Sequence, residues 1–187
     1  MHYQPQHHLL KDRIILVTGA SDGIGREAAL TYSRYSASVV LVGRNEEKLR
    51  SVAQEIDQAG GLPARWFTLD LLTCTPQECQ QLAQQIGVHY PRLDGVLHNA
   101  GLLGDVCPMD RQKPEVWQQV MQVNVNGTFM LTQALLPLLL KSGSLVFTSS
   151  SVGRQGRANW GAYAASKFAT EGMMPVSYTH LTLPTKA

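Results

Sequence analysis

Two side chains that could move a proton stand four residues apart, at Tyr163 and Lys167. On a helix, residues at this spacing lie on one face, one turn from each other. A fixed ammonium beside a phenol favours the phenolate, so it lowers a pKa that starts near ~10. We therefore expect Tyr163 to act as a general acid or base near neutral pH. Most Tyr-x-x-x-Lys pairs are solvated helix faces, so the rest of the chain has to support this assignment.

Hydroxyl groups that could assist this pair follow an apolar run just upstream. Residues 144–148 have the pattern of a buried strand, and Ser149, Ser150 and Ser151 come directly after it. In open α/β sheets, ligands bind beyond the carboxyl ends of the strands. We therefore expect these hydroxyls in the same pocket as Tyr163, although the residue pattern alone does not distinguish among the three serines.

A glycine-rich turn lies between an apolar strand pattern, residues 13–18, and a helix pattern that starts near residue 24. Glycines permit a tight turn and a close approach of a pyrophosphate, and the free N–H groups of the helix N-terminus hold the anion. The sequence therefore predicts a dinucleotide-binding loop; the alternative is a turn with a structural role only. The candidate residues of this loop are Gly19, Ser21, Asp22, Gly23, Ile24 and Gly25.

The second strand pattern, residues 38–42, is followed by Gly43, Arg44 and Asn45. NAD sites of this type often place an acidic residue here to bind the ribose hydroxyls. A carboxylate would repel a 2′-phosphate, whereas a guanidinium binds it through charge-assisted hydrogen bonds. Arg44 therefore favours NADP as the cofactor, with NAD possible. The alternative is a solvated arginine at the start of a helix.

Polar residues also follow the third and fourth strand patterns. Asp70 follows residues 63–69 and could accept a hydrogen bond from an adenine amino group, while Asn99 and Gly101 follow residues 93–98. Asn124 lies inside a long helical pattern, where asparagine is a mediocre residue. A buried polar role is predicted for Asn124, and a surface position is the alternative.

Strand and helix patterns alternate five times, which predicts an α/β fold: a doubly wound parallel sheet of the Rossmann type with right-handed crossovers. We expect a capping box from Thr75 to Glu78, a bend at Pro137 and an interruption of the last helix at Pro175. The expected strands are 13–18, 38–42, 63–69, 93–98 and 144–148, and the expected helices are 24–35, 45–60, 75–90, 115–141 and one from 161.

One dinucleotide-binding and catalytic domain is expected over residues 13–174, after an N-terminal extension of residues 1–12. Residues 175–187 have no helical period and no charge pairing. We expect them to form either a short strand or disordered tail, or a segment foreign to the native protein. The sheet is then incomplete at its C-terminal edge.

Composition narrows the class of protein. The 187 residues are 44% hydrophobic and 16% charged, with a net charge of +2 and scattered basic residues, so neither a nucleic-acid surface nor an anionic-membrane surface is expected. The apolar run Leu135–Leu140 is too short to span a bilayer and is expected to be the buried end of a helix. Three cysteines without metal spacing, and a first segment without an apolar signal region, favour the cytoplasm. A metal site at His2, His7 and His8 is less consistent with this segment than a solvated terminus.

Together these residues resemble the short-chain dehydrogenase/reductase family, and within it an enterobacterial, poorly characterised branch. The resemblance covers about residues 12–174 and rests on several motifs that occur in register. They are the cofactor loop 18–25, the adenine-contacting pair Asp70 and Leu71, the triplet Asn99, Ala100 and Gly101, and the tetrad Asn124, Ser150, Tyr163 and Lys167. The family places its serine thirteen residues before the tyrosine, which selects Ser150.

The resemblance implies a reaction and a role for each tetrad residue. Hydride passes between NADP (or NAD) and a small carbonyl or secondary-alcohol substrate, with no metal. Tyr163 exchanges the proton at the substrate oxygen. Lys167 lowers the pKa of the Tyr163 phenol and holds the nicotinamide ribose. Ser150 hydrogen-bonds the substrate oxygen, and Asn124 positions a water that links Lys167 to solvent.

Full-length members of the family continue beyond the last helix with further strands and a substrate-covering helix, and they are commonly homo-oligomers. The resemblance therefore implies a homo-oligomeric full-length parent. It also leaves an alternative for this chain, a truncated nucleotide-binding fragment with little or no turnover.

Overall fold

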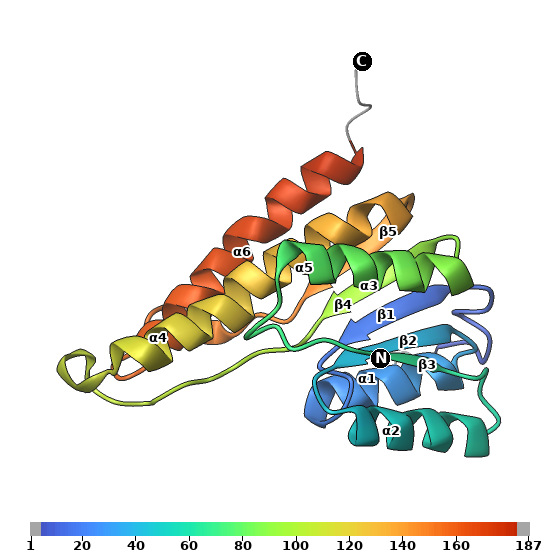
Figure 1. The fold of residues 1–187 in the computed structure, drawn as a ribbon, viewed down its shortest axis with the longest axis horizontal. Coiled ribbons are helices and arrows are strands. Elements are labelled where there is room, and N and C mark those ends of the chain that lie inside the picture. The colour runs from blue at the N-terminus through green and yellow to red at the C-terminus, as the bar shows by residue number, and fades with distance from the viewer. Residues whose placement is uncertain (1–4, 183–187) are drawn as a thin grey trace.

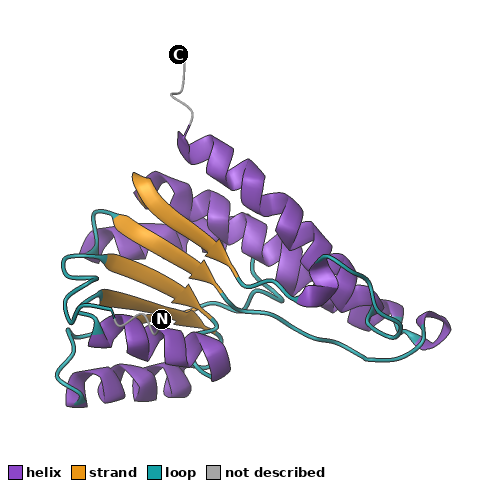
Figure 2. Ribbon diagram, turned by 180° about the vertical axis from the view of Figure 1, so that it is seen from behind, coloured by secondary structure: helices purple, strands orange, loops and turns teal. Residues whose placement is uncertain are grey.

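A computed structural model describes residues 5–182; His2 of the expected solvated N-terminus and residues 183–187 of the expected tail lie outside this range. Five parallel strands form one sheet in the order β3-β2-β1-β4-β5. Their arrowheads point the same way, so their carboxyl ends share one edge (Figure 2). The predicted doubly wound α/β fold is confirmed. The strands are β1 (Ile14–Thr18), β2 (Ser38–Gly43), β3 (Arg65–Thr68), β4 (Leu93–His98) and β5 (Leu139–Phe147).

Helices cover both faces of this sheet. α1 (Gly23–Arg34) and α2 (Glu46–Gln58) lie on one face, and α3 (Pro76–His89), α5 (Thr128–Leu135) and α6 (Gly161–Thr182) lie on the other (Figure 1). Successive residues of a strand point to opposite faces of the sheet. Leu16 packs in the core under α3 and α5, and Val17 packs in the core under α1 and α2. The central strands β1 and β2 are mostly apolar because both of their faces are buried, whereas the outer strands β3 and β5 carry exposed polar residues.

Local signals set the starts of α2 and α3 as predicted, and a further cap stands at α1. Asn45 caps α2 by accepting a hydrogen bond from the backbone N–H of Lys48 at 2.9 Å. Thr75 and Glu78 form the predicted capping box at the start of α3. Asp22 caps α1 and accepts from the N–H of Gly23 at 2.8 Å. Such caps satisfy N–H groups that the first turn of a helix leaves free.

The predicted long helix over 115–141 is wrong in its middle and at its end. It is divided into α4 (Pro114–Met121), a π-helical turn (Gln122–Gly127) and α5, and a 3-10 turn (Leu136–Leu138) follows. Pro137 does not bend a continuing helix, because proline cannot donate the next helical hydrogen bond and the chain passes into β5. The run Leu135–Leu140 is therefore a helix end joined to a strand start. β5 begins at Leu139 and pairs there with Leu93 of β4.

The predicted interruption at Pro175 is also wrong. α6 continues through Pro175 to Thr182. A proline removes one helical hydrogen bond and can be accommodated as a kink when the turns on either side hold. Ala162, Ala164 and Ser166 of the first turns are buried against the rest of the fold, which anchors the helix ahead of the proline.

Candidate active site

The predicted glycine loop sits at the carboxyl edge of the sheet, against the turn that follows β4. The hydroxyl of Thr18, the last residue of β1, accepts hydrogen bonds from the backbone N–H groups of Asn99 and Ala100, both at 3.1 Å. Gly19 has a φ of +65°, and a β-carbon there would stand 2.9 Å from the Cα of Ala100. A β-carbon on Gly25 would stand 2.3 Å from the carbonyl oxygen of Gly19. Both glycines are therefore required by close backbone contacts.

A cavity of about 160 Å³ opens beside this loop. Its walls come from the carboxyl ends of four strands and the segments that follow them. Seven predicted cofactor residues line it: Gly19, Ser21, Arg44, Asp70, Leu71, Ala100 and Gly101. The other predicted loop residues, Asp22, Gly23, Ile24 and Gly25, belong to the start of α1 or its cap, and Asn99 stands behind the loop.

The Arg44 guanidinium is exposed at this cavity, and no hydrogen bond or ion pair ties it to the residues that the structure describes. Asp70 is partly buried, and its carboxylate accepts from the N–H of Leu72 at 3.0 Å. The site therefore offers both a free cation and an oriented carboxylate on its walls.

Asn124 is buried, with 3% of its surface exposed, which decides between the two alternatives for this residue. Its Oδ1 accepts from the N–H of Leu102 at 2.7 Å, and its Nδ2 donates to the Leu102 carbonyl and to Ser166 Oγ, each at 2.9 Å. Both N–H donors of the amide are thus used within the protein. The side chain ties the loop after β4 to α6.

Tyr163 and Lys167 lie on one face of α6 as predicted. Lys167 Nζ stands 5.4 Å from the centroid of the Tyr163 ring and donates to the carbonyl oxygen of Thr148 at 2.6 Å. A β-carbon on Gly101 would stand 3.5 Å from Asn124 Oδ1 and 3.8 Å from Lys167 Nζ, so this turn brings the amide and the ammonium together.

The predicted lowering of the Tyr163 pKa is wrong for this arrangement. Burial raises the pKa of the Tyr163 phenol and lowers the pKa of the Lys167 ammonium. The ammonium lies over the ring and donates to the Thr148 carbonyl, and no hydrogen bond joins it to the phenol oxygen in the described part of the chain. Desolvation then decides both pKa values, because it disfavours the charged form of each group.

Ser150 caps the 3-10 turn Ser151–Gly153, and its Oγ accepts from the N–H of Val152 at 3.5 Å. The three candidate serines differ in their surroundings. Ser151 is exposed, whereas Ser149 Oγ is buried and faces Glu171, whose carboxyl pKa it helps to lower. A β-carbon on Gly153 would stand 3.0 Å from the Lys167 backbone, so the serine turn packs directly on α6.

Sequence reasoning missed the residues that connect these groups. Thr148 binds Lys167 through its carbonyl and donates its hydroxyl to Asn99 Oδ1 at 3.1 Å. Thr18 and Ser166 have similar connecting roles. The available signal was the placement of Thr18 and Thr148, since both are hydroxyl residues at the carboxyl ends of apolar strands.

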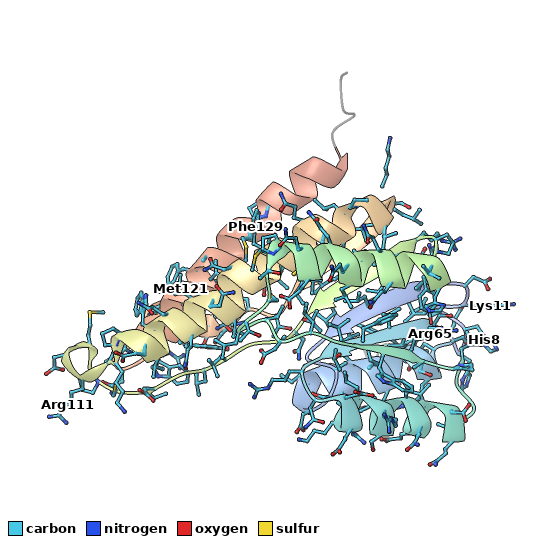
Figure 3. All side chains as sticks on the ribbon, viewed as in Figure 1. His8, Lys11, Arg65, Arg111, Met121 and Phe129 are labelled. Carbon is cyan, nitrogen blue, oxygen red and sulfur yellow. The ribbon has the colours of Figure 1, made fainter. Side chains whose placement is uncertain are left out.

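A larger hollow of about 450 Å³ adjoins the cavity beside the glycine loop and shares Arg44, Leu69 and Asp70 with it. Other hollows lie elsewhere. One of about 700 Å³ is lined by residues that include His8 and Lys11, at the opposite edge of the sheet (Figure 3).

Over residues 5–182, no helix is long and apolar enough to cross a lipid bilayer. The same part of the chain holds no cluster of three His, Cys, Asp or Glu residues suited to a metal ion.

Comparison with curated proteins finds relatives along most of the chain. The uncharacterized oxidoreductase YciK of Escherichia coli K12 is 79% identical over 178 residues, which are 94% of this chain and 71% of YciK. The 3-oxoacyl-[acyl-carrier-protein] reductase FabG of Thermotoga maritima is 33% identical over 88% of this chain and 66% of its own length. The chain thus spans about two thirds of the length of these relatives.

Comparison with solved structures finds the same group of relatives. The oxidoreductase yciK from E. coli superposes with a TM-score of 0.92 at 79% identity, over 94% of this chain and 73% of that one. A short chain dehydrogenase of Shigella flexneri 2a complexed with NADP gives a TM-score of 0.90 at 78% identity, over 91% and 72% of the two chains. The predicted resemblance to an enterobacterial branch is confirmed.

The sequence profile of the short chain dehydrogenases matches residues 13–181. This range holds the glycine loop, the cavity that Arg44 lines, and the helix that carries Tyr163 and Lys167. The chain belongs to the short-chain dehydrogenase family.

Proposed function

We propose that this chain carries the site of an NADP-dependent oxidoreductase, which transfers a hydride between the nicotinamide cofactor and a carbonyl or secondary-alcohol substrate. One observation carries the proposal: residues far apart in sequence, from the glycine loop to Gly101, meet around one cavity at the carboxyl edge of the sheet. Ligands bind at this edge in open α/β sheets. The names of the relatives, an oxidoreductase and a reductase, support the same reaction class.

The residues present suit a dinucleotide. A side chain at Gly19 or Gly25 would clash with neighbouring backbone, so the loop is made of bare backbone at both positions. The first turn of α1 presents free N–H groups that suit a pyrophosphate. Arg44 supplies an unpaired cation for a 2′-phosphate. The NADP and NADPH complexes of relatives from S. flexneri and E. coli CFT073 support NADP over NAD. When bound, the cofactor gives or accepts the hydride, while the protein supplies position and polarity.

Tyr163 is the proposed proton donor at the substrate oxygen. Since burial raises the pKa of this phenol, Tyr163 holds its proton at neutral pH, which favours donation to a carbonyl oxygen. Lys167 is proposed to hold the nicotinamide ribose and Ser150 to hydrogen-bond the substrate oxygen. Asn124 acts as a positioning residue, because its amide holds Leu102 and Ser166; the water relay predicted for it stays a prediction.

The cofactor assignment is tested by titrating NADPH and NADH against the chain and an Arg44→Ala variant. A charge-assisted contact is worth roughly 1.5–3 kcal/mol, so the variant should lose about ten- to hundredfold in NADPH affinity. Its NADH affinity should stay within about twofold. Arg50→Ala is the matched control, because Arg50 lies on α2 and pairs with Glu46 at 2.8 Å. Equal affinities of the unmodified chain for the two cofactors would contradict the assignment.

The chemistry is tested with Tyr163→Phe, which keeps the ring and removes the proton donor. Reduction of a panel of ketones and aldehydes, followed by NADPH consumption, should fall by at least ~10²-fold. NADPH affinity should be nearly unchanged. A variant that retains most of the turnover would show that Tyr163 is not the acid.

A second candidate is a nucleotide-binding unit with little turnover of its own. β5 is an edge strand of the described sheet, and its Val146 is 49% exposed. An edge strand with exposed apolar side chains presents unpaired backbone groups that invite pairing with another chain. The two candidates separate when this chain is compared with a version extended to the full length of YciK: NADPH binding by both, but ketone reduction only by the extended one, would favour the second.

We further propose that the full-length parent is a cytosolic homo-oligomer. Phe129 of α5 and Phe168 of α6 are 54% and 47% exposed, and large exposed aromatic side chains are enriched at protein interfaces. Light scattering of the extended protein gives its mass directly. A monomer at micromolar concentration would exclude this assembly.

A further inference from the structure

A negative charge stands in the cofactor loop beside the residues that meet a 2′-phosphate. Asp22 follows Ser21, which lines the cavity together with Arg44. A hydrogen bond from Lys48 and another from the backbone of Gly23 hold the pKa of the Asp22 carboxyl below its usual value, so it is ionised at neutral pH. An ionised carboxylate at this position repels a second phosphate group.

Lys48 meets this charge from the neighbouring helix. Its Nζ stands 2.7 Å from Asp22 Oδ2. Lys48 lies in the first turn of α2, four residues after Arg44, so the ion pair joins the loop after β1 to the helix after β2. A β-carbon on Gly43 would stand 3.6 Å from Ser21 Oγ, so these two segments are also in close contact at the residues that precede the pair.

The other charges of this first turn do not take over the role of Lys48. Glu46 is paired with Arg50 at 2.8 Å, and Glu47 adds a further negative charge. Arg44 is the cation that faces the cavity without a partner, and it is needed for the phosphate itself. Without Lys48, Asp22 would keep the hydrogen bond from Gly23 and the weaker effect of Arg26, which is itself paired with Glu55, so most of the compensation of its charge would be lost.

We propose that Lys48 is a specificity-determining residue for the cofactor: it neutralises Asp22 and so allows the loop to accept the 2′-phosphate that Arg44 attracts. This inference rests on the proposed dinucleotide-binding function. It predicts that the Asp22–Lys48 pair sets the preference for NADPH over NADH and leaves the parts common to both cofactors largely untouched.

The test measures the dissociation constants of NADPH and NADH for the chain and three variants, by tryptophan fluorescence in low-salt buffer. Lys48→Gln should lower the ratio of NADPH to NADH affinity by about three- to tenfold, as expected for one unit charge near a phosphate in water. Asp22→Asn should raise the ratio by a similar factor, because Lys48 is then free. Asparagine is also a good N-cap, so α1 keeps its capping residue. The double variant should return to within about twofold of the unmodified chain.

Two controls isolate the charge effect. Arg50→Gln removes one positive charge from the same helix and should leave the ratio unchanged. Raising the ionic strength should shrink the effect of Lys48→Gln, since the pair is exposed to solvent.

An unchanged ratio in Lys48→Gln, or a double variant that stays at the Lys48→Gln value, would overturn the inference while the proposed function stands. If the unmodified chain binds neither NADPH nor NADH, both the proposed dinucleotide binding and this inference are refuted. The two failures are therefore distinguishable.

Discussion

Replacing Asn124 by alanine is expected to destabilise the fold strongly, although the side chain is small and polar. The amide makes three hydrogen bonds, two to the backbone of Leu102 and one to Ser166 Oγ. A hydrogen bond contributes about 0.5–1.5 kcal/mol net, and buried groups left without a partner cost more. We therefore expect Asn124→Ala to lower the free energy of unfolding by about 3 kcal/mol.

The same π-helical turn provides a matched control. Asn126 is exposed and makes one side-chain hydrogen bond, to Gln122 Oε1 at 3.2 Å. Asn126→Ala should change stability by less than about 0.5 kcal/mol, as exposed positions usually do. The comparison keeps the substitution and the local backbone alike and varies only the burial and the partners.

Urea unfolding followed by circular dichroism measures the difference. With a slope of about 2 kcal/mol per molar urea, the midpoint of Asn124→Ala should fall by about 1.5 M. The midpoint of Asn126→Ala should stay within about 0.3 M of the unmodified chain. Equal midpoints for the two variants would refute the reasoning that Asn124 holds Leu102 and Ser166 in the folded chain.

Two further predictions concern the glycine loop and a buried histidine. Gly25→Ala should weaken NADPH binding at least about hundredfold in a titration, because its β-carbon would meet the Gly19 carbonyl at 2.3 Å; Gly156→Ala, with nothing within 4 Å, should bind normally. Burial lowers the pKa of His98 from 6.5 to about 4. Between these two pH values the unfolded chain binds a proton at His98 and the folded chain does not. The stability from neutral His98 is full above about pH 6.5 and is lost as pH falls to about 4, on the order of 3 kcal/mol in total. His98→Gln should flatten this part of a pH-stability profile and His89→Gln should not; equal slopes in both variants would contradict the assignment.

The candidate site could be predicted from sequence where its signals are local. The glycine loop, the caps at Asn45 and Thr75, and the four-residue spacing of Tyr163 and Lys167 depend on neighbours a few residues away. Apolar runs at the right spacing were enough to predict a buried parallel sheet. Arg44 was expected at the cofactor pocket because strand ends share one edge, and it lines that cavity.

Contacts between distant segments could not be predicted in the same way. The partner of Lys48 lies 26 residues away in the glycine loop, and Asn124 meets Ser166 across 42 residues. The pKa of Tyr163 moves opposite to the expected direction because the phenol is buried when α6 packs on the fold, and Lys167 donates its hydrogen bond to the Thr148 carbonyl.

What the sequence determined by itself is the order of strands and helices, their caps, and the residue types at each strand end, because these depend on short-range sterics and hydrogen bonding. Tertiary structure alone decided where the long helix breaks into a π-helical turn, and that α6 passes through Pro175. It also decided which hydroxyl, amide and ammonium groups pair at the site. These outcomes depend on burial, since a polar group that loses water takes whichever partner the packed chain brings within reach.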